Sequence, residues 1–333
     1  MSLRIGWRPH SNDGAIASVR FRALTPIRAL KALGVEAELF DERRAQDYHA
    51  VVFSKRYDAK SQVLARALSG RGAAIIFDLS DNHFYNPYDL RDYRAAAENI
   101  RTMIAAADLV TCCSEELARV IEAEASPQAA PAVIGDAVEA FAVHRAPEDA
   151  VFRMLWFGSH GSPNAPAGME DLLRIREHID AAAAARPSEL VIVSNNEAKF
   201  RVLKDSFAAR VRYEPWSEAA FARELSRAHA VVVPACPNPF TACKSTNRPA
   251  TALWHGAPVI ADAVPSYETL APFITIDDWA RGFAEALAGS DAMRARTAAG
   301  QAHVRASMTE EAIGAQWLAA IEGVTKRVQT SRR

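Results

Sequence analysis

Short apolar runs alternate with amphipathic segments along the whole chain. In the first half, most of the runs rich in apolar or β-branched residues are followed by a stretch whose apolar positions recur at helical spacing. This order is typical of a buried parallel sheet with helices packed on its faces. We predict strands at residues 3–7, 35–40, 50–54, 74–79, 109–113 and 132–134.

The clearest helical pattern covers residues 17–33. Leu24, Ile27 and Leu30 lie on or near one face of such a helix, and Gly34 is a typical stop signal. A second helix is predicted over residues 91–107.

The alternation breaks at residues 141–151, a polar stretch that contains Pro147, and then restarts. Further strands are predicted at residues 154–157, 190–194, 211–213, 230–234, 258–262 and 274–276, with a helix over 169–179. Two such halves favour two doubly wound α/β domains. We place a first domain at 1–142, a linker at 143–152, a second domain at 153–308, and a last helix and tail at 309–333 that could pack back on the first domain.

The last helix has the pattern of a capping box. Ser307 and Glu310 have the spacing of that motif, so we expect the helix to begin there. An apolar stripe follows at Ile313, Trp317 and Ile321, which predicts a buried face.

Charge and composition exclude some classes of protein. The 333 residues include 39 Lys and Arg and 40 Asp and Glu, a net charge of −1, whereas a general nucleic-acid binder needs a basic excess or stripe. No apolar run approaches the ~20 residues of a membrane span. The first residues lack the apolar core of a signal peptide, so we expect a cytoplasmic protein, with peripheral membrane contact left open. The four cysteines lack zinc-site spacing and are expected to be reduced.

Residues 229–270 have a layout suited to a diphosphate. A predicted strand opens into a polar loop, and a helix with Lys244, Ser245 and Asn247 near its start follows. Free N–H groups at a helix start attract anions, and Lys244 adds a full charge. Arg248 is a second candidate cation. The alternatives are a solvated lysine and simple helix capping.

The loop after the strand at 154–157 is a second candidate ligand site. Gly158 would let a ligand approach the backbone, and Ser159 and His160 follow it. The glycine spacing matches neither the dinucleotide fingerprint nor the Walker loop, so NAD and ATP are not indicated.

Polar residues in the first half follow strand ends, where α/β proteins bind ligands. His10 and Asn12 lie in the loop after the first strand, Arg20 and Arg22 lie near the start of the first helix, and Lys55 ends another strand. We interpret them as candidates for holding an acidic substrate, against the alternative of ordinary surface residues.

Residues 78–85 carry the candidate proton-transfer groups. Asp81 or His83 could deprotonate a hydroxyl group, with Asp78 and Asn82 beside them. The alternative is a hydrogen-bonded turn. Two carboxylates alone are a weak signal for Mg²⁺, so no metal site is predicted.

Several segments resemble GT-B glycosyltransferases near family 4. The segments are residues 18–22, 108–117, 133–138, 155–159, 211–216, 230–234 and, most specifically, 244–261. The resemblance implies two Rossmann-like domains facing across a cleft, with a nucleoside-diphosphate sugar on the second domain and the acceptor on the first. It also implies retention of anomeric configuration and no bound metal or cofactor, and it places the nucleobase near Trp216, which could stack on the base or simply pack in the core.

The chain departs from this family at one motif. Where many members carry two glutamates, this sequence has Cys243 and Thr251, so Thr251 stands at a donor-binding position without a carboxylate. Lys244 and Ser245 match relatives with a lysine–serine pair. We therefore predict a glycosyltransferase. The alternatives are a sugar-nucleotide epimerase of the same fold and a non-catalytic sugar-nucleotide or glycan-binding protein.

Overall fold

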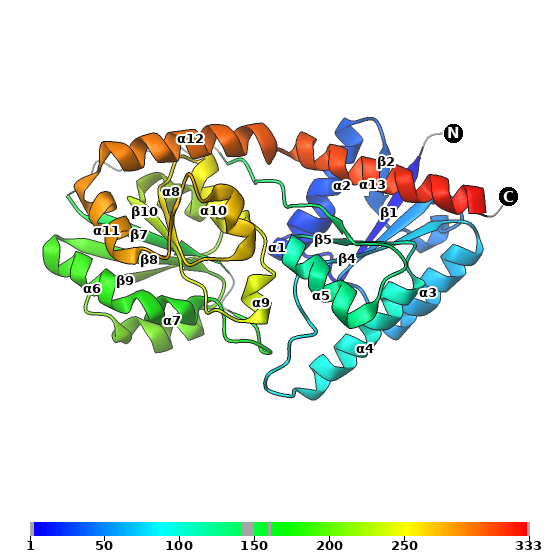
Figure 1. Ribbon diagram of the computed structural model, residues 1–333, viewed down its shortest axis with the longest axis horizontal. Coiled ribbons are helices and arrows are strands. Elements are labelled where there is room, and N and C mark those ends of the chain that lie inside the picture. The colour runs from blue at the N-terminus through cyan, green and yellow to red at the C-terminus, as the bar shows by residue number, and fades with distance from the viewer. Residues whose placement is uncertain (1–2, 142–149, 159–160, 332–333) are drawn as a thin grey trace. The chain divides into compact units, whose positions relative to one another are not determined.

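The computed structural model describes residues 3–141, 150–158 and 161–331, and it divides into two compact units. The first unit comprises Met1–Ala137, Cys243–Ser245 and Met308–Arg333. The second unit comprises Val138–Ala242 and Thr246–Ser307. Each unit contains one six-stranded parallel sheet with helices around it (Figure 1). The predicted α/β class, with two doubly wound domains, is thus confirmed.

The sheet of the first unit has the strand order β2-β1-β3-β4-β5-β6. Its strands are β1 (Arg4–Pro9), β2 (Glu36–Leu39), β3 (Ala50–Ser54), β4 (Ala74–Leu79), β5 (Leu109–Cys112) and β6 (Ala132–Val133). Strands β3 and β4 are buried along their whole length, which explains their apolar sequences. The order reverses between β1 and β3, and parallel sheets bind ligands at such a switch point.

The first helix is interrupted by a π-helical turn. The structure has α1 (Ala17–Val19), a π turn at Arg20–Leu24 and α2 (Thr25–Ala32) where the sequence predicts one continuous helix. Pro26 has no N–H to give to the carbonyl of Arg22 four residues earlier. That carbonyl instead accepts a hydrogen bond from Trp7 Nε1 at 2.9 Å. The π turn therefore follows from a proline that the helical periodicity does not reveal.

The other helices of this unit begin at side-chain caps or pack on the sheet. They are α3 (Ala59–Gly70), α4 (Arg91–Ala106), α5 (Glu115–Ala125) and α13 (Glu310–Ser331). The carboxylate of Asp58 caps α3 and the hydroxyl of Ser114 caps α5.

Helix α13 supplies part of the core of the first unit. It runs alongside α2, and Trp317 packs edge-on against Trp7 with ring centroids 5.4 Å apart (Figure 1). The predicted cap at Ser307 is wrong, because this residue still lies in α12 (Asp291–Ser307) and its hydroxyl bonds the carbonyl of His303. Thr309 caps α13 instead, accepting a hydrogen bond from the N–H of Ala312.

The sheet of the second unit has the order β12-β11-β10-β7-β8-β9. Its strands are β7 (Phe152–Phe157), β8 (Ser188–Ser194), β9 (Arg210–Pro215), β10 (Ala230–Val233), β11 (Val259–Ala261) and β12 (Thr275–Ile276). Its helices are α6 (Arg176–Ala185), α7 (Glu197–Leu203), α8 (Glu218–Arg227), α9 (Pro239–Ala242), α10 (Asn247–Trp254), α11 (Trp279–Ala288) and α12. The switch point lies between β7 and β10, so this sheet offers a second ligand edge.

One predicted helix of the second unit has a different form. Residues Met169–Ile175 are a 3₁₀ segment, and the α-helix begins only at Arg176. The buried carboxylate of Asp171 holds this tighter turn, since it accepts hydrogen bonds from the N–H groups of Gly168 and Cys236. Within the described residues, no helix combines the length and apolar character that crossing a membrane requires.

Two glycines of α13 provide a test of how closely this helix packs. A Cβ on Gly314 would lie 2.7 Å from the Cβ of Ala29, whereas a Cβ on Gly323 would meet only the end of Arg327 at 3.9 Å. Alanine favours a helix over glycine by ~0.8–1 kcal/mol at either position. We expect Gly323→Ala to raise the free energy of unfolding by up to about 1 kcal/mol. Gly314→Ala should lower it by about 1–2 kcal/mol, because the overpacking penalty exceeds the propensity gain.

Urea denaturation of both variants measures the difference directly. The two substitutions share the same propensity term, so equal midpoints would contradict the close packing of α13 on α2.

Candidate functional site

The carboxyl edge of the first sheet brings together ionisable side chains from three adjacent strands. His10 follows β1, Lys55 follows β3 and Asp81 follows β4. The backbone itself joins the first two strands here, because His10 N–H donates to the carbonyl of Ser54 at 2.9 Å. These three residues, which the sequence predicts at strand ends, therefore lie at the same edge of the first sheet.

Lys55 has a strained backbone at this edge. Its φ is +50°, a left-handed conformation that costs a residue other than glycine about 1–3 kcal/mol. Its N–H donates to the carbonyl of Asp78 at 2.8 Å, and its ammonium group forms an ion pair with Asp81. Such strain persists only where surrounding bonds enforce it, and it is frequent at functional sites.

A three-residue segment from far along the sequence completes this cluster. Cys243–Ser245 belongs to the first unit although its flanking residues belong to the second. Ser114 Oγ donates to the carbonyl of Cys243 at 2.8 Å, and Ser245 Oγ donates to Asp136 Oδ2 at 2.6 Å. Lys244 forms an ion pair with Asp81. Lys244 and Ser245 thus bind Asp81 and Asp136 of the first unit, whereas the sequence predicts them at the start of a helix.

Asp81 is held as an anion by two lysines. Burial by itself would raise the pKa of its carboxyl group, but the charges of Lys244 and Lys55 outweigh burial and lower the pKa well below the usual range. A carboxylate with such a low pKa is a weak base. Asp81 is therefore suited to positioning the two ammonium groups and not to accepting a proton.

His83 is held between two tyrosines. Its Nδ1 lies 3.2 Å from the hydroxyl of Tyr57, and its ring makes edge contacts with Tyr57 and Tyr93 at centroid distances of 6.1 and 6.0 Å. Burial, followed by the charge of Lys55, lowers the pKa of His83 to about 4. The imidazole is therefore neutral at pH 7. When Nδ1–H donates to Tyr57, Nε2 can accept a proton.

Tyr57 and Tyr93 are contacts that the sequence does not reveal. Tyr57 lies two residues after Lys55 and Tyr93 lies in the first turn of α4, and neither has a pattern that separates it from a packing residue.

Two further predicted residues of this unit, Asn82 and Arg20, have structural partners. Asn82 is buried, and its side-chain oxygen accepts hydrogen bonds from the N–H groups of Phe84 and Tyr85, as in an Asx turn. Arg20 donates to the carbonyls of Gly14 and Ala15 and so closes the loop after β1. Asn12 is exposed in that loop.

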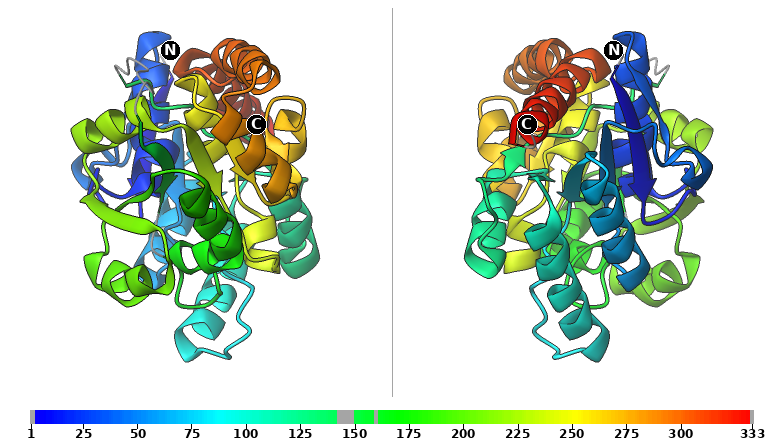
Figure 2. Two further views of the ribbon diagram at one scale, coloured as in Figure 1. Left: turned by 90° about the vertical axis from the view of Figure 1, so that its left-hand side faces the viewer. Right: turned by 90° about the vertical axis from the view of Figure 1, so that its right-hand side faces the viewer.

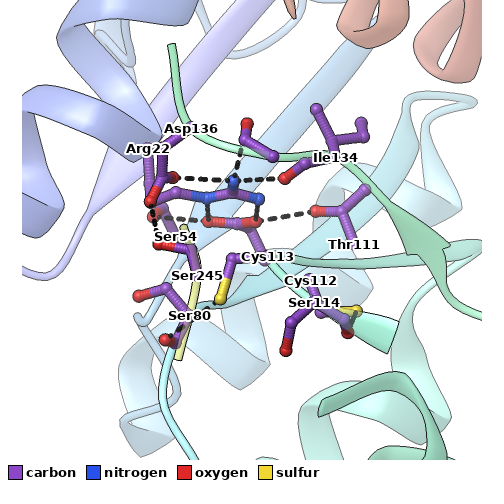
Figure 3. A network of polar contacts seen from close by, with 12 residues as sticks. Arg22, Ser54, Ser80, Thr111, Cys112, Cys113, Ser114, Ile134, Asp136 and Ser245 are labelled. Carbon is purple, nitrogen blue, oxygen red and sulfur yellow. Dashed lines mark hydrogen bonds and ion pairs between the residues drawn. The ribbon is translucent and has the colours of Figure 1, made fainter. Parts of the chain in front are cut away.

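Arg22 lies inside the unit, where the sequence suggested a ligand contact. The Arg22 side chain is 1% exposed and that of Asp78 is 0% exposed, and the two form an ion pair at 2.6 Å. Figure 3 shows the guanidinium group at the centre of the network, with Asp136 and the carbonyl of Ile134 around it. Burial opposes the charge of Arg22, but Asp78 and Asp136 outweigh it and raise the pKa above its ordinary value. This network leaves Arg22 and Asp78 engaged with the protein itself.

The network also joins three strands. Ser54 Oγ at the end of β3 and Thr111 Oγ1 in β5 each donate to Asp78 at 2.9 Å. Ser245 reaches the same network through Asp136. The buried ion pair therefore fixes the strand ends from which Lys55 and Asp81 extend.

The second unit has its own polar site at its switch point. Gly158 follows β7 with a φ of +155°, and a Cβ there would lie 3.6 Å from the side chain of Arg248. Arg248 lies in the first turn of α10 and forms a hydrogen bond with Tyr267. It also interacts electrostatically with the carboxylate of Asp171. The Arg248 side chain, through its Cδ, and the ring of Trp156 thus lie beside a glycine that has no side chain of its own.

Two further groups extend this site. The side-chain nitrogen of Asn247, at the first position of α10, is buried and makes no hydrogen bond within the described part of the chain. Lys199 Nζ would lie 3.1 Å from a Cβ on Gly161, and Lys199 pairs with Glu170 at 2.8 Å. Sequence reasoning missed Lys199 because it lies in a different helix, α7. Ser159 and His160 lie outside the described residues.

Trp216 and Thr251 complete the predicted donor residues. Trp216 follows β9 and is half-buried. Its backbone N–H donates to the carbonyl of Ser194 at 2.9 Å. Thr251 is buried inside α10. Among residues 3–141, 150–158 and 161–331, no group of three His, Cys, Asp or Glu side chains could hold a metal ion.

Two doubly wound parallel sheets in one chain are the architecture of the GT-B fold. Solved structures match it along nearly the whole chain. HepE of Anabaena, in complex with UDP, is 13% identical and covers 96% of this chain and 100% of its own, with a TM-score of 0.68. A sucrose-phosphate synthase from Thermosynechococcus elongatus is 15% identical, with 98% and 100% coverage and a TM-score of 0.67.

A glycosyltransferase from Rickettsia africae is 11% identical, with 98% and 99% coverage and a TM-score of 0.65. At these identities the likeness concerns the fold. No protein-family model matches the chain. No curated protein sequence matches it either.

Replacing Arg22 tests the buried network. Arg22→Met leaves Asp78 and Asp136 buried without a counter-charge, so we expect the free energy of unfolding of the full chain to fall by about 3–5 kcal/mol in urea denaturation. Arg28→Met is the control, because it removes an exposed ion pair with Glu310 and should change stability by ~0–1 kcal/mol. Adding Asp78→Leu to Arg22→Met should recover part of the loss. Equal effects of the Arg22 and Arg28 substitutions would contradict the role of the network.

The two neutral histidines predict a pH dependence of stability. The pKa of His10 is also lowered to about 4, by burial and then by Lys55, so the folded chain binds these two protons only near pH 4. The unfolded chain binds them near its ordinary pKa of 6.5, and stability should therefore fall as the pH drops from about 6.5 to 4. The lowered pKa of Asp81 acts below its ordinary value of 3.8, outside this window.

The midpoints of urea denaturation at about pH 7.5 and about pH 5 measure this loss of stability. His83→Gln should make it smaller, whereas His303→Gln, at an exposed position, should leave it unchanged. An identical loss in both variants would count against the neutral state of His83.

Proposed function

We propose that this protein is a glycosyltransferase that moves a sugar from a nucleoside-diphosphate sugar to a hydroxyl group of an acceptor. The observation that carries the proposal is the placement of Arg248 against Gly158 at the switch point of the second sheet. A diphosphate binds where the backbone has no side chain in the way and a cation is close, and Gly158 and Arg248 are such a pair. The likeness of the fold to HepE, whose structure contains UDP, supports the same assignment.

The donor diphosphate is proposed to lie on the second unit. Arg248 would neutralise the phosphate oxygens, and Asn247 and the N–H groups at the start of α10 would donate hydrogen bonds. Lys199, beside Gly161, is a further candidate cation. Negative charge grows on the leaving phosphate as its bond to the sugar breaks, so fixed donors at this place lower the barrier.

The acceptor is proposed to lie on the first unit. As the acceptor oxygen bonds to the anomeric carbon, its proton passes to Nε2 of His83, and the nucleoside diphosphate leaves with the electron pair of the broken bond. Tyr57 would orient the imidazole, in the way that a positioned partner usually orients a catalytic histidine. Lys55 and Lys244, held by Asp81, would supply positive charge beside the reacting atoms.

The reaction is proposed to retain the anomeric configuration, as the resemblance to family 4 implies, so the acceptor oxygen would bond to the anomeric carbon on the face that the phosphate leaves. The support is the resemblance alone, because Cys243 and Thr251 replace the paired glutamates of that family. Proton NMR of the first product formed from a donor of known configuration tests the point, and an inverted product would contradict it.

Nucleotide binding tests the donor site. Thermal shift and calorimetry with UDP, GDP, ADP and CDP should reveal binding of at least one nucleotide, and a ligand at 100 times its Kd adds ~2.7 kcal/mol of stability. Arg248→Ala should weaken that binding by about tenfold to a hundredfold, because a hydrogen bond to a charged group contributes ~1.5–3 kcal/mol. Arg201→Ala, an exposed arginine of α7, is the matched control.

Turnover separates the three candidate functions. A transferase releases the nucleotide from a sugar donor, an epimerase changes the sugar while the nucleotide stays attached, and a binding protein does neither. The proposal fails if no nucleotide binds, or if binding is the same in the Arg248 and Arg201 variants.

A further inference from the structure

An open groove lies on the first unit beside His83. Its cavity volume is about 630 Å³, within the ~300–1,000 Å³ typical of ligand sites. The lining comes from the loop before α4 and the first turns of that helix, and includes Phe84, Asn86, Arg91, Tyr93, Arg94 and Arg101. Figures 1 and 2 show this cyan segment projecting from the rest of its unit.

The walls of the groove are fixed by local bonds. Asn86 exchanges two hydrogen bonds with the backbone of Leu90, both at 2.9 Å, which shapes the loop. Arg101 stacks over the ring of Phe84 at 5.4 Å and donates to the carbonyl of Glu124 at 2.9 Å. A ligand would therefore meet a largely preformed surface, and binding would cost little ordering entropy.

One side chain, Tyr93, separates the groove from the proposed catalytic histidine. Tyr93 lines the groove, and its ring lies 6.0 Å from that of His83. The buried side chain of Asn82 binds the N–H of Phe84, so one turn carries both His83 and a wall of the groove. A molecule in the groove thus extends to within one side chain of the proton acceptor.

The lining chemistry identifies the class of ligand. Aromatic rings offer flat apolar faces to the C–H side of a sugar ring, and guanidinium groups bind carboxylates through paired hydrogen bonds. Arg94 pairs with Asp89 and Arg101 pairs with Glu98, so Arg91 is the lining arginine that is exposed without an ion pair among the described residues. We propose that the groove binds an acidic oligosaccharide, the acceptor of the transferase proposed above, with its reactive end toward His83. The acceptor part of this assignment rests on that proposed function.

A lipid surface fits this segment less well. Residues 84–101 contain three arginines and three acidic residues (Asp89, Asp92 and Glu98), so their net charge is zero. Arg94 pairs with Asp89, and Arg101 pairs with Glu98 and Glu124. Binding to an anionic membrane needs an excess of basic residues, whereas a shaped groove needs only a few placed ones.

Direct binding to the full chain without donor tests the groove. The probes are tetragalacturonate, the neutral tetramer maltotetraose, and vesicles of phosphatidylglycerol and phosphatidylcholine. We expect calorimetry to detect tetragalacturonate binding, with maltotetraose at least tenfold weaker. Arg91→Ala, at an exposed position, and Phe84→Ala should each weaken tetragalacturonate binding at least tenfold. Arg119→Ala, an exposed arginine of α5, should leave it unchanged.

Three outcomes would overturn the assignment. The first is no binding of tetragalacturonate, and the second is equal binding by the Arg91 and Arg119 variants. The third is binding of vesicles alone, lost in Arg91→Ala, which would make the segment a membrane contact. UDP affinity, measured in parallel, should be the same in all variants. If none of UDP, GDP, ADP and CDP binds to the unmodified chain, the transferase proposal fails, while tetragalacturonate still decides whether the groove binds acidic glycans.

Discussion

The ion pair between Arg22 and Asp78 is the interaction on which the polar edge of the first unit depends. Both side chains are at most 1% exposed, so neither charge is solvated by water and each needs the other. Asp78 also accepts hydrogen bonds from β3 and β5, and its backbone carbonyl binds the N–H of Lys55. A single buried carboxylate thus sets the relative positions of the strand ends that present Lys55 and Asp81.

The sequence predicts most of the sheet architecture because buried parallel strands have short apolar sequences. Strands β3 and β4 begin and end at the predicted residues. The π turn around Arg22 was not predictable from periodicity, since one proline decides which carbonyl lacks a helical partner. The burial of Arg22 was equally hidden, because its two carboxylate partners lie 56 and 114 residues away along the chain. A charged residue near a strand end has the same local sequence whether it binds a ligand or the interior.

Part of the candidate site was also predictable from the sequence, and part of it was not. The alternation of strands and helices in the sequence predicts a parallel sheet, and His10, Lys55 and Asp81 each follow one of its strands. Their place at the carboxyl edge of the sheet therefore follows from the topology. Lys244 was expected at the start of a helix, but α10 begins at Asn247. Its partner Asp81 is 163 residues away, and no local pattern encodes such a pairing. Tyr57 and Lys199 were missed for the same reason: only the folded chain brings them beside their histidine and glycine.

The contribution of α13 to the first unit has a consequence for protein synthesis. Trp317, Ile321 and Val324 are fully buried in the core cluster that also contains Trp7, so that core needs residues made more than three hundred positions after its first strand. Domains usually fold in order as the ribosome produces them. Here the first unit must instead wait, with an apolar face uncovered, until the last helix emerges. Its sheet is therefore exposed to chaperones, and to aggregation, throughout translation of the second unit.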